Sequence, residues 1–208
     1  MQSWQTTYLG LKDLPRELSA FELQTFFTYS RAEREVIDTR YGITHKLGLA
    51  LHLGFLRMSG RSLNAIRVMP GSLWTHLGKE LGVRPPELAS LKALYGRRST
   101  LFEHQQLAQE TLGFRWLTEH QRRAFVRALR DEVTRLSDKD QLLMFARRWL
   151  YDHKLLIEHD RALRSQIAVA VDLLESETGT SIATTVPSDL LDKWRYALAQ
   201  LRPDGQTQ

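Results

Sequence analysis

The chain has 208 residues, a net charge of +5 at pH 7 and no cysteine. This length suits one or two domains, each with a buried core. The lack of cysteine excludes disulfides, cysteine-ligated metal sites and thiol nucleophiles. The longest apolar stretch, Leu47 to Leu56, is about half of the ~20 residues that a membrane span needs, and no secretory signal is visible. We therefore expect a cytoplasmic protein without a membrane partner.

The positive charge is distributed unevenly along the chain. Residues 1–96 and 97–164 each carry a net charge of +4, whereas residues 165–208 carry −3, and 22 of the 29 cationic side chains are arginines. The guanidinium group is a planar donor that suits phosphates and guanine edges. The composition therefore favours a nucleic-acid partner, although solvated arginine-rich helix faces would give the same composition.

Helical signals dominate the chain, and strand signals are almost absent. A capping box at Ser30 and Glu33 predicts a short helix that ends at Gly42, because the hydroxyl and the carboxylate can satisfy the first free amides. The next helix, from His45 to Met58 with Thr44 as its cap, is apolar on nearly every side. We expect it to lie buried at the centre of a core.

Prolines and glycines divide the following segment into short helices. Gly60 ends the apolar helix, and two helices are expected over residues 71–81 and 85–95. Proline suits the start of a helix and glycine its end. The residues that mark these boundaries are Pro70, Gly82, Pro85, Pro86 and Gly96.

The second half of the chain predicts five further helices. Most of them begin at a side chain whose oxygen can cap the first turn. The expected helices are 99–112, capped by Ser99 or Thr100 and ended by Gly113; 118–136, capped by Thr118; one from Asp138 or Ser137 to about His153; 163–174; and, after a loop at 179–188, a last helix to Leu201 with a frayed tail at 202–208.

The segment from Trp74 to Ala93 fits a helix-turn-helix template. Gly78 and Gly82 allow a close helix approach and a tight turn, while leucines of both helices point inward. The second helix would present Arg84, Ser90 and Lys92 to the major groove or to phosphates. Two packed helices of an ordinary bundle are the alternative interpretation.

A second, weaker candidate runs from Leu142 to Val171. A helix, the short turn LLIEH and another helix repeat the arrangement, without the glycine expected in a tight turn. This pair would direct Arg161, Arg164 and Ser165 outward. In the expected helix at 118–136, three cationic side chains gather opposite the apolar face. They are Arg123, Arg127 and Arg130.

The segment between these two candidates carries a basic loop. Arg97 and Arg98 directly follow the first recognition helix, and a paired arginine near a hydroxyl at a helix N-terminus suits phosphate contact. Ion pairs with Glu103 or Glu87 are the alternative. Three further polar residues of this segment join the candidates for DNA contact, namely Thr100, His104 and Arg115.

No enzyme motif is found in the sequence. HExxH, a phosphate loop with GK[ST], GxSxG and GxGxxG are all missing. The carboxylates are scattered beside arginine and lysine on helix faces, where surface pairing is their expected role. We therefore assign no catalytic residue, no metal ligand and no cofactor to this chain.

Two stretches of the sequence are distinctive, FFTYSRAEREVIDTRYG and LGLALHLGFLRMSGRSL, the second of which includes Arg57 and Arg61. They resemble the N-terminal, DUF4158-like DNA-binding region of Tn3-family transposases: the first is similar to the family opening, and the second matches the family pattern LGxALxLxxLRxxGR. The resemblance runs from about Phe26 to Leu201. A string of Tyr95, Arg98, Thr100, Glu103 and His104 and the stretch LGFR ending at Arg115 also match. The chain departs from the family at His45, Lys46, Leu101 and Phe102.

The resemblance implies that the chain binds the terminal inverted repeats of a transposon as duplex DNA. In that family a metal-dependent, RNase H-like acidic triad far toward the C-terminus does the DDE-type chemistry, and nothing in this chain matches it. This chain is therefore expected not to be an enzyme itself, to need no metal and to associate with the bacterial nucleoid. The alternative is a scaffold that holds transposase subunits together through its C-terminal stretch and the helices around Trp149 or Trp194.

We thus predict an all-α fold of about nine or ten short helices that form two helix-turn-helix-like DNA-binding subdomains and a C-terminal helical segment. The expected parts are a first subdomain at 1–96, a connector at 97–117, a second subdomain at 118–178, and a loop with a last helix at 179–208. The expected DNA-contact residues are Arg57, Arg61, Arg84, Ser90, Lys92, Arg97, Arg98, Thr100, His104, Arg115, Arg123, Arg127, Arg130, Arg161, Arg164 and Ser165.

Overall fold

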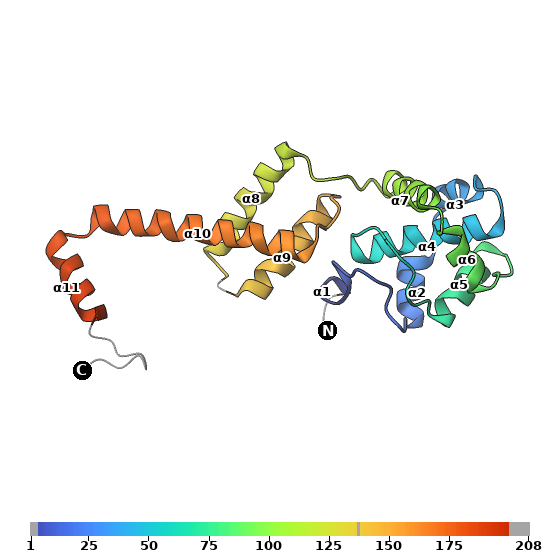
Figure 1. Cartoon of the computed structure of the whole chain (residues 1–208), viewed down its shortest axis with the longest axis horizontal. Coiled ribbons are helices and arrows are strands. Elements are labelled where there is room, and N and C mark those ends of the chain that lie inside the picture. The colour runs from blue at the N-terminus through green and yellow to red at the C-terminus, as the bar shows by residue number, and fades with distance from the viewer. Residues whose placement is uncertain (1–3, 137, 200–208) are drawn as a thin grey trace.

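The computed structural model describes residues 4–136 and 138–199 (Figure 1). The predicted all-α fold is confirmed, since these residues form eleven helices and no strand. Ser137, Leu201 and the tail that was expected to fray lie outside the described residues. The helices are α1 (Trp4–Tyr8), α2 (Ala20–Phe27), α3 (Arg31–Asp38), α4 (Ile43–Ser59), α5 (Gly71–Leu81), α6 (Leu88–Leu94), α7 (Arg98–Leu112), α8 (Glu119–Val133), α9 (Lys139–Asp152), α10 (Asp160–Thr185) and α11 (Ser188–Ala199).

Helix α4 forms the centre of a first core, as its sequence predicts. Twelve of its 17 residues are buried, and it packs against α2, α3, α5, α6 and α7. Burial on all sides requires close contacts: a Cβ added to Gly54 would lie 2.1 Å from Cδ1 of Phe27. The glycine therefore lets the Phe27 ring lie directly on the α4 backbone, where this ring is fully buried.

Helices α8, α9 and α10 form a second core beside the first (Figure 1). Each helix turns its apolar stripe inward, and Leu9 from the N-terminal segment joins the same cluster. Beyond the core, α10 continues away from the bundle and leads to α11, none of whose described side chains is buried. The large buried side chains that α8, α9 and α10 contribute to the second core are Phe125, Leu129, Leu142, Leu143, Leu150, Leu163 and Ile167.

Most helix ends follow the predicted capping chemistry. Capping boxes form at Ser30 with Glu33 and at Thr118 with Gln121, and the Asp138 side chain caps α9. Left-handed glycines end three helices as predicted, at Gly60, Gly82 and Gly113.

Three predicted helix starts are wrong. Thr44 lies inside α4, because Gly42 with φ of +86° lets the helix begin at Ile43. Pro85 and Pro86 precede α6, since the Trp74 indole donates a hydrogen bond to the Pro86 carbonyl and holds both prolines in the turn. Helix α7 begins at Arg98 and has no side-chain cap, so the last predicted start, at Ser99 or Thr100, falls inside the helix.

The predicted loop at 179–188 is mostly helix. Helix α10 continues to Thr185, and the hydroxyls of its polar stretch bond to carbonyls one turn earlier in the helix: Thr180 to Ser176 at 2.9 Å and Thr184 to Thr180 at 3.0 Å. Helices α1 and α2 are additional to the predicted set, although α2 opens with a capping box of Ser19 and Glu22.

Candidate nucleic-acid interface

A tight turn joins α5 to α6. Gly82 adopts φ of +66°, and the Val83 amide donates to the Gly78 carbonyl at 2.9 Å. Gly78 lies directly under Pro85: a Cβ added there would be 2.3 Å from the proline Cγ and 2.9 Å from the Val83 carbonyl oxygen. Only glycine fits at position 78 without a shift of the turn, so the two glycines perform the roles that the sequence predicts.

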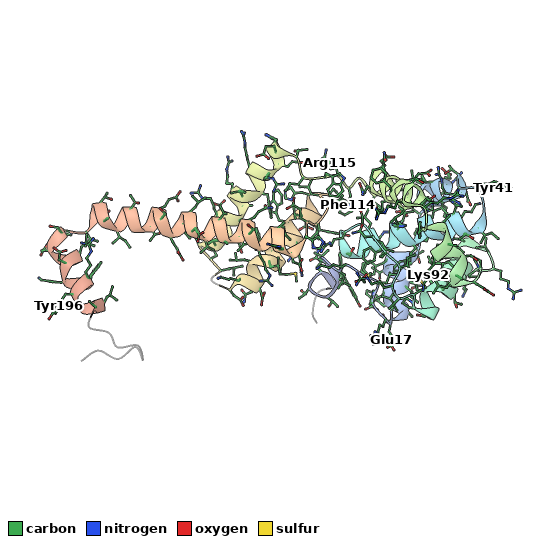
Figure 2. All side chains as sticks on the ribbon, in the orientation of Figure 1. Glu17, Tyr41, Lys92, Phe114, Arg115 and Tyr196 are labelled. Carbon is green, nitrogen blue, oxygen red and sulfur yellow. The ribbon has the colours of Figure 1, made fainter. Side chains whose placement is uncertain are left out.

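Buried leucines hold this helix pair on α4. Leu73 and Leu77 of α5 and Leu91 of α6 are fully buried in the first core. Ser90 and Lys92 flank the buried Leu91 on either side, and both side chains are exposed; Lys92 is labelled in Figure 2. The helix pair therefore has one side fixed by packing and one side free to meet a partner.

The turn before α6, α6 itself and the start of α7 carry exposed cations. We call this region the α5–α6 surface and define it by Arg84, Ser90, Lys92, Arg97 and Arg98, all of which are exposed. The described part of the chain contains no ion pair to any of these four cations. Glu103, the proposed alternative partner of the arginine pair, is bonded to Arg40 instead. Thr100 is half-buried inside α7.

A second cationic surface lies on α8 and the start of α10. Arg123 and Arg127 line a shallow depression on the outer face of α8, opposite the buried Phe125 and Leu129. Arg130 lines the same depression, and its guanidinium binds the Glu177 carboxylate at 2.6 and 2.7 Å. We call these three arginines the α8 surface.

The beginning of α10 is exposed as predicted. Arg161, Arg164 and Ser165 all lie open to solvent. Arg164 forms an ion pair of 2.9 Å with Asp140, whose side chain is 80% exposed. Such exposed pairs contribute little and exchange readily, so this pair leaves Arg164 available to another anion.

Arg57 has a structural role and is not a candidate for DNA contact. Its guanidinium binds Glu33 at 2.5 Å and the carbonyls of Phe26 and Thr28 at 2.7 and 2.9 Å. Burial alone would raise the pKa of Glu33, but hydrogen bonds from Ser30 and the charge of Arg57 lower it. Arg57 therefore ties α2 and α3 to α4, and three of its hydrogen bonds go to these helices and the residue that follows α2.

Arg61 and His104 are also buried, which corrects their predicted role. Arg61 donates to the carbonyl of Gly10 at 3.1 Å. His104 is fully buried, its Nδ1 lies 2.9 Å from the Tyr95 hydroxyl, and burial lowers its pKa to about 4. An enclosed, neutral imidazole cannot reach a phosphate, so this side chain belongs to the core between α4, α6 and α7.

The connector places Arg115 at a fixed point between the two cores. Its amide donates to the Lys154 carbonyl at 3.0 Å and its carbonyl accepts from Leu156 at 2.9 Å. Its side chain is exposed, while the neighbouring Phe114 is buried (Figure 2). Because the backbone is held on both sides, the guanidinium projects from a rigid support.

Two exposed residues next to Arg115 were not among the predicted contacts. Trp116 is 68% exposed, and Lys154 lies across the backbone bridge with its ammonium 4.8 Å from the Phe114 ring centroid. Trp116 directly follows the LGFR stretch, so its position in the sequence could have signalled it. Nothing local marks Lys154, because the pairing of two distant segments brings it here.

Within residues 4–136 and 138–199, no cluster of three or more histidine, aspartate or glutamate side chains is arranged to hold a metal ion. None of the helices described above combines the length and the apolar character that crossing a membrane requires.

The fold and its surfaces define an all-α protein with two helical cores, each bearing exposed cations. Residues 5–169 match the family described as Domain of unknown function (DUF4158), and the chain belongs to this family. Over 208 residues the chain is 59% identical to the transposase for insertion sequence element IS1071 in transposon Tn5271, from Comamonas testosteroni. Over 181 residues, 87% of the chain, it is 23% identical to the transposase for transposon Tn1546 from Enterococcus faecium. The chain covers 21% and 18% of these relatives, about a fifth of their length.

Proposed function

We propose that this chain binds duplex DNA at the terminal inverted repeats of a transposable element, as the N-terminal part of a Tn3-family transposase. The observation that carries this proposal is a set of eight exposed cations, each without an ion pair within the part of the chain that the structure describes. They lie on both helical units and on the connector. They are Arg84, Lys92, Arg97, Arg98, Arg115, Arg123, Arg127 and Arg161.

Unpaired exposed arginines favour DNA over an acidic protein surface in this setting. Both relatives named above are transposases, which act on DNA ends. A guanidinium that is not held by a carboxylate keeps all its donors for phosphates or guanine edges. The geometry of α5, the glycine turn and α6 supports a helix-turn-helix reading unit, with Arg84, Ser90 and Lys92 closest to the bases.

The proposal assigns this chain a binding role without catalysis. Strand cleavage and transfer, and the divalent metal that they use, belong to parts of the transposase that this chain does not span. Binding to chromosomal and element DNA would place the protein at the bacterial nucleoid. The second unit, with Arg161, Arg164 and Ser165, would supply a further set of DNA contacts.

Fluorescence anisotropy with labelled duplexes tests the proposal. The probe is the terminal repeat of the element that encodes this chain, and the control is a scrambled duplex of the same composition. We expect the binding free energy to favour the repeat over the control by about 4 kcal/mol or more. With six to eight phosphates contacted, log K should fall against log salt with a slope of roughly −5 to −7. Equal affinity for both duplexes would refute specific binding.

Two classes of variant separate base contacts from phosphate contacts. Arg84→Ala and Lys92→Ala should each weaken binding to the repeat by about 1–3 kcal/mol. Arg127→Ala should weaken binding to both duplexes and reduce the salt slope by about 1. Lys193→Ala, an exposed cation on α11 outside both surfaces, is the matched control and should change neither value. Unchanged affinity in both Arg84→Ala and Lys92→Ala would mean that α6 is not the reader.

A subunit scaffold is the second candidate function, and α11 provides the observation that favours it. Trp194 is 52% exposed, Tyr196 71% and Leu198 65%. Trp194 and Leu198, four residues apart, share one face of α11, and an exposed apolar patch of this kind is typical of a protein interface. Sedimentation with and without the repeat duplex separates the two functions: a stable dimer that ignores DNA favours the scaffold, whereas a monomer that binds the duplex favours DNA recognition.

A further inference from the structure

The two helical units meet at a junction built from backbone as well as side chains. The Gly10 amide donates to the Ser59 carbonyl at 2.8 Å, and the Ile157 amide donates to the Gly60 carbonyl at 2.9 Å. The connector adds the bridge between Arg115 and Leu155. One backbone hydrogen bond, from Ile157 to Gly60, thus joins the two units directly, while the N-terminal segment and the connector are each tied by backbone contacts to one of the units.

Aromatic rings seal the same junction. The Trp4 ring packs edge-on against Phe26 of the first unit and Tyr151 of the second, at centroid distances of 5.3 and 5.5 Å. The Tyr151 hydroxyl donates to the Arg57 carbonyl at 2.7 Å. A Cβ added to Gly60 would lie 2.7 Å from Cδ1 of Ile157. This contact leaves no room for the units to slide past each other.

A charged cluster lies within the junction. Arg147 of α9 binds Asp160 of α10 at 2.9 Å, and Arg61, which comes from the first unit, lies 3.8 Å from the other oxygen of the same carboxylate. The Arg61 side chain is only 9% exposed and the Arg147 side chain only 17%. Gly10 covers the cluster, since a Cβ there would be 2.6 Å from Nε of Arg147. We call these four residues the junction cluster.

Charge balance explains why this cluster would oppose movement of the units. Separating them would withdraw Arg61 from the Asp160 carboxylate and uncover the Arg147 guanidinium, against which Gly10 of the first unit lies. A buried guanidinium that loses its partners is strongly unfavourable unless water replaces them. Units joined only by a linker move relative to each other by default, and the junction cluster removes that freedom.

We propose that the junction cluster holds the two units in one fixed arrangement. The chain then binds DNA tightly only when the two DNA segments that it contacts are separated by one distance and one helical rotation. This inference rests on the proposed DNA-binding function. It makes Arg61, Arg147 and Asp160 positioning residues, which act through the placement of the α5–α6 and α8 surfaces and touch no DNA themselves. The sequence predicts that Arg61 contacts DNA. Under this proposal it would instead help to fix the spacing between the two sets of DNA contacts.

DNA with altered spacing tests the inference in the unmodified chain. Footprinting on the terminal repeat gives the two protected segments, and about 5 base pairs, half of the roughly 10.5 base pairs in a turn, are then inserted between them. If the two units are held rigidly, the chain can contact only one of the two DNA segments after the insertion, so affinity should fall about 100-fold or more. Insertion of a full turn should also weaken binding, because the distance between the segments changes.

Variants of the cluster should relax this requirement. Asp160→Asn keeps the size of the side chain and removes its charge, and Arg61→Leu removes the cation from the first unit. Each should reduce the penalty for the 5-base-pair insertion to less than about 10-fold while binding to a duplex with one segment stays as in the unmodified chain. Asp152→Asn is the matched control, because its ion pair with Arg148 is exposed, and it should retain the full penalty.

A distance measurement tests rigidity without DNA. Since the chain has no cysteine, Thr75→Cys on α5 and Ala168→Cys on α10, both exposed positions, can carry two spin labels. We expect one narrow distance distribution, which broadens in Asp160→Asn or Arg61→Leu. A broad distribution in the parent chain would overturn the inference, as would a narrow one combined with tolerance of the insertion. A narrow distribution with no preference for the repeat would instead contradict the proposed function.

Discussion

The turn between α5 and α6 provides the sharpest test of the fold around the reading unit. Replacing Gly78 with alanine places a methyl group against three atoms: Cγ of Pro85 at 2.3 Å, Cδ of Pro85 at 2.6 Å and the Val83 carbonyl oxygen at 2.9 Å. A proline ring and a backbone carbonyl cannot swing aside as a flexible side chain would. The turn must therefore move as a whole.

The size of the effect follows from two opposing contributions. Overpacking costs about 1–3 kcal/mol, and three atoms within 3.0 Å justify the upper end, ~3 kcal/mol. Alanine is favoured over glycine inside a helix by about 1 kcal/mol. We therefore expect Gly78→Ala to lower the free energy of unfolding by about 2 kcal/mol and to weaken DNA binding as α6 shifts.

A matched glycine isolates the steric contribution. Gly179 lies inside α10 with no atom within 4 Å of an added Cβ, so Gly179→Ala should raise the free energy of unfolding by about 0.5–1 kcal/mol. Urea denaturation followed by tryptophan fluorescence measures both variants. If Gly78→Ala is as stable as Gly179→Ala, the close approach of the turn to α5 is not real and the reasoning fails.

Two further predictions concern buried polar groups of the first core. Burial lowers the pKa of His52 to about 3 and that of His104 to about 4. The unfolded chain therefore binds more protons than the folded chain below pH ~6.5, and the free energy of unfolding should decrease as pH falls from about 6.5 toward 4. Urea midpoints measured at several pH values check this, and a flat profile over that range would contradict it. Arg57→Ala leaves the Glu33 carboxylate without its main partner and should cost about 3 kcal/mol of stability. If Arg57→Ala instead left stability unchanged and weakened only DNA binding, its structural role would be wrong.

Local chemistry in the sequence predicts much of the fold. The apolar surface of α4 leaves no polar side, so its central position follows from hydrophobic periodicity alone. Gly60 and Gly82 end helices because a left-handed residue closes the last turn, and this depends only on neighbours within a few positions. Features with a local physical cause were therefore predictable.

The roles of several polar residues depend on distant partners and were not predictable in this way. Arg57 meets Glu33 across 24 positions and Arg61 meets Gly10 across 51, and nothing beside either arginine in the sequence indicates burial. The Thr- and Ser-rich end of α10 was misassigned for a different reason. Its hydroxyls favour loops when they bond locally outside a helix, but here Thr180 and Thr184 bond to carbonyls inside it.

The N-terminal segment has a consequence for the order in which the chain can fold. Trp4 contacts Tyr151, which lies 147 positions later, and Leu9 belongs to the core of α8, α9 and α10. At about 5–20 residues per second, translation needs roughly 7–30 s to supply those partners. The core around α4 can assemble on the ribosome in that interval, and Trp4 can already pack on Phe26, while Leu9 has no partner from its own core. Leu9, which is synthesised before every other buried residue of its core, is thus among the last residues to reach its final position.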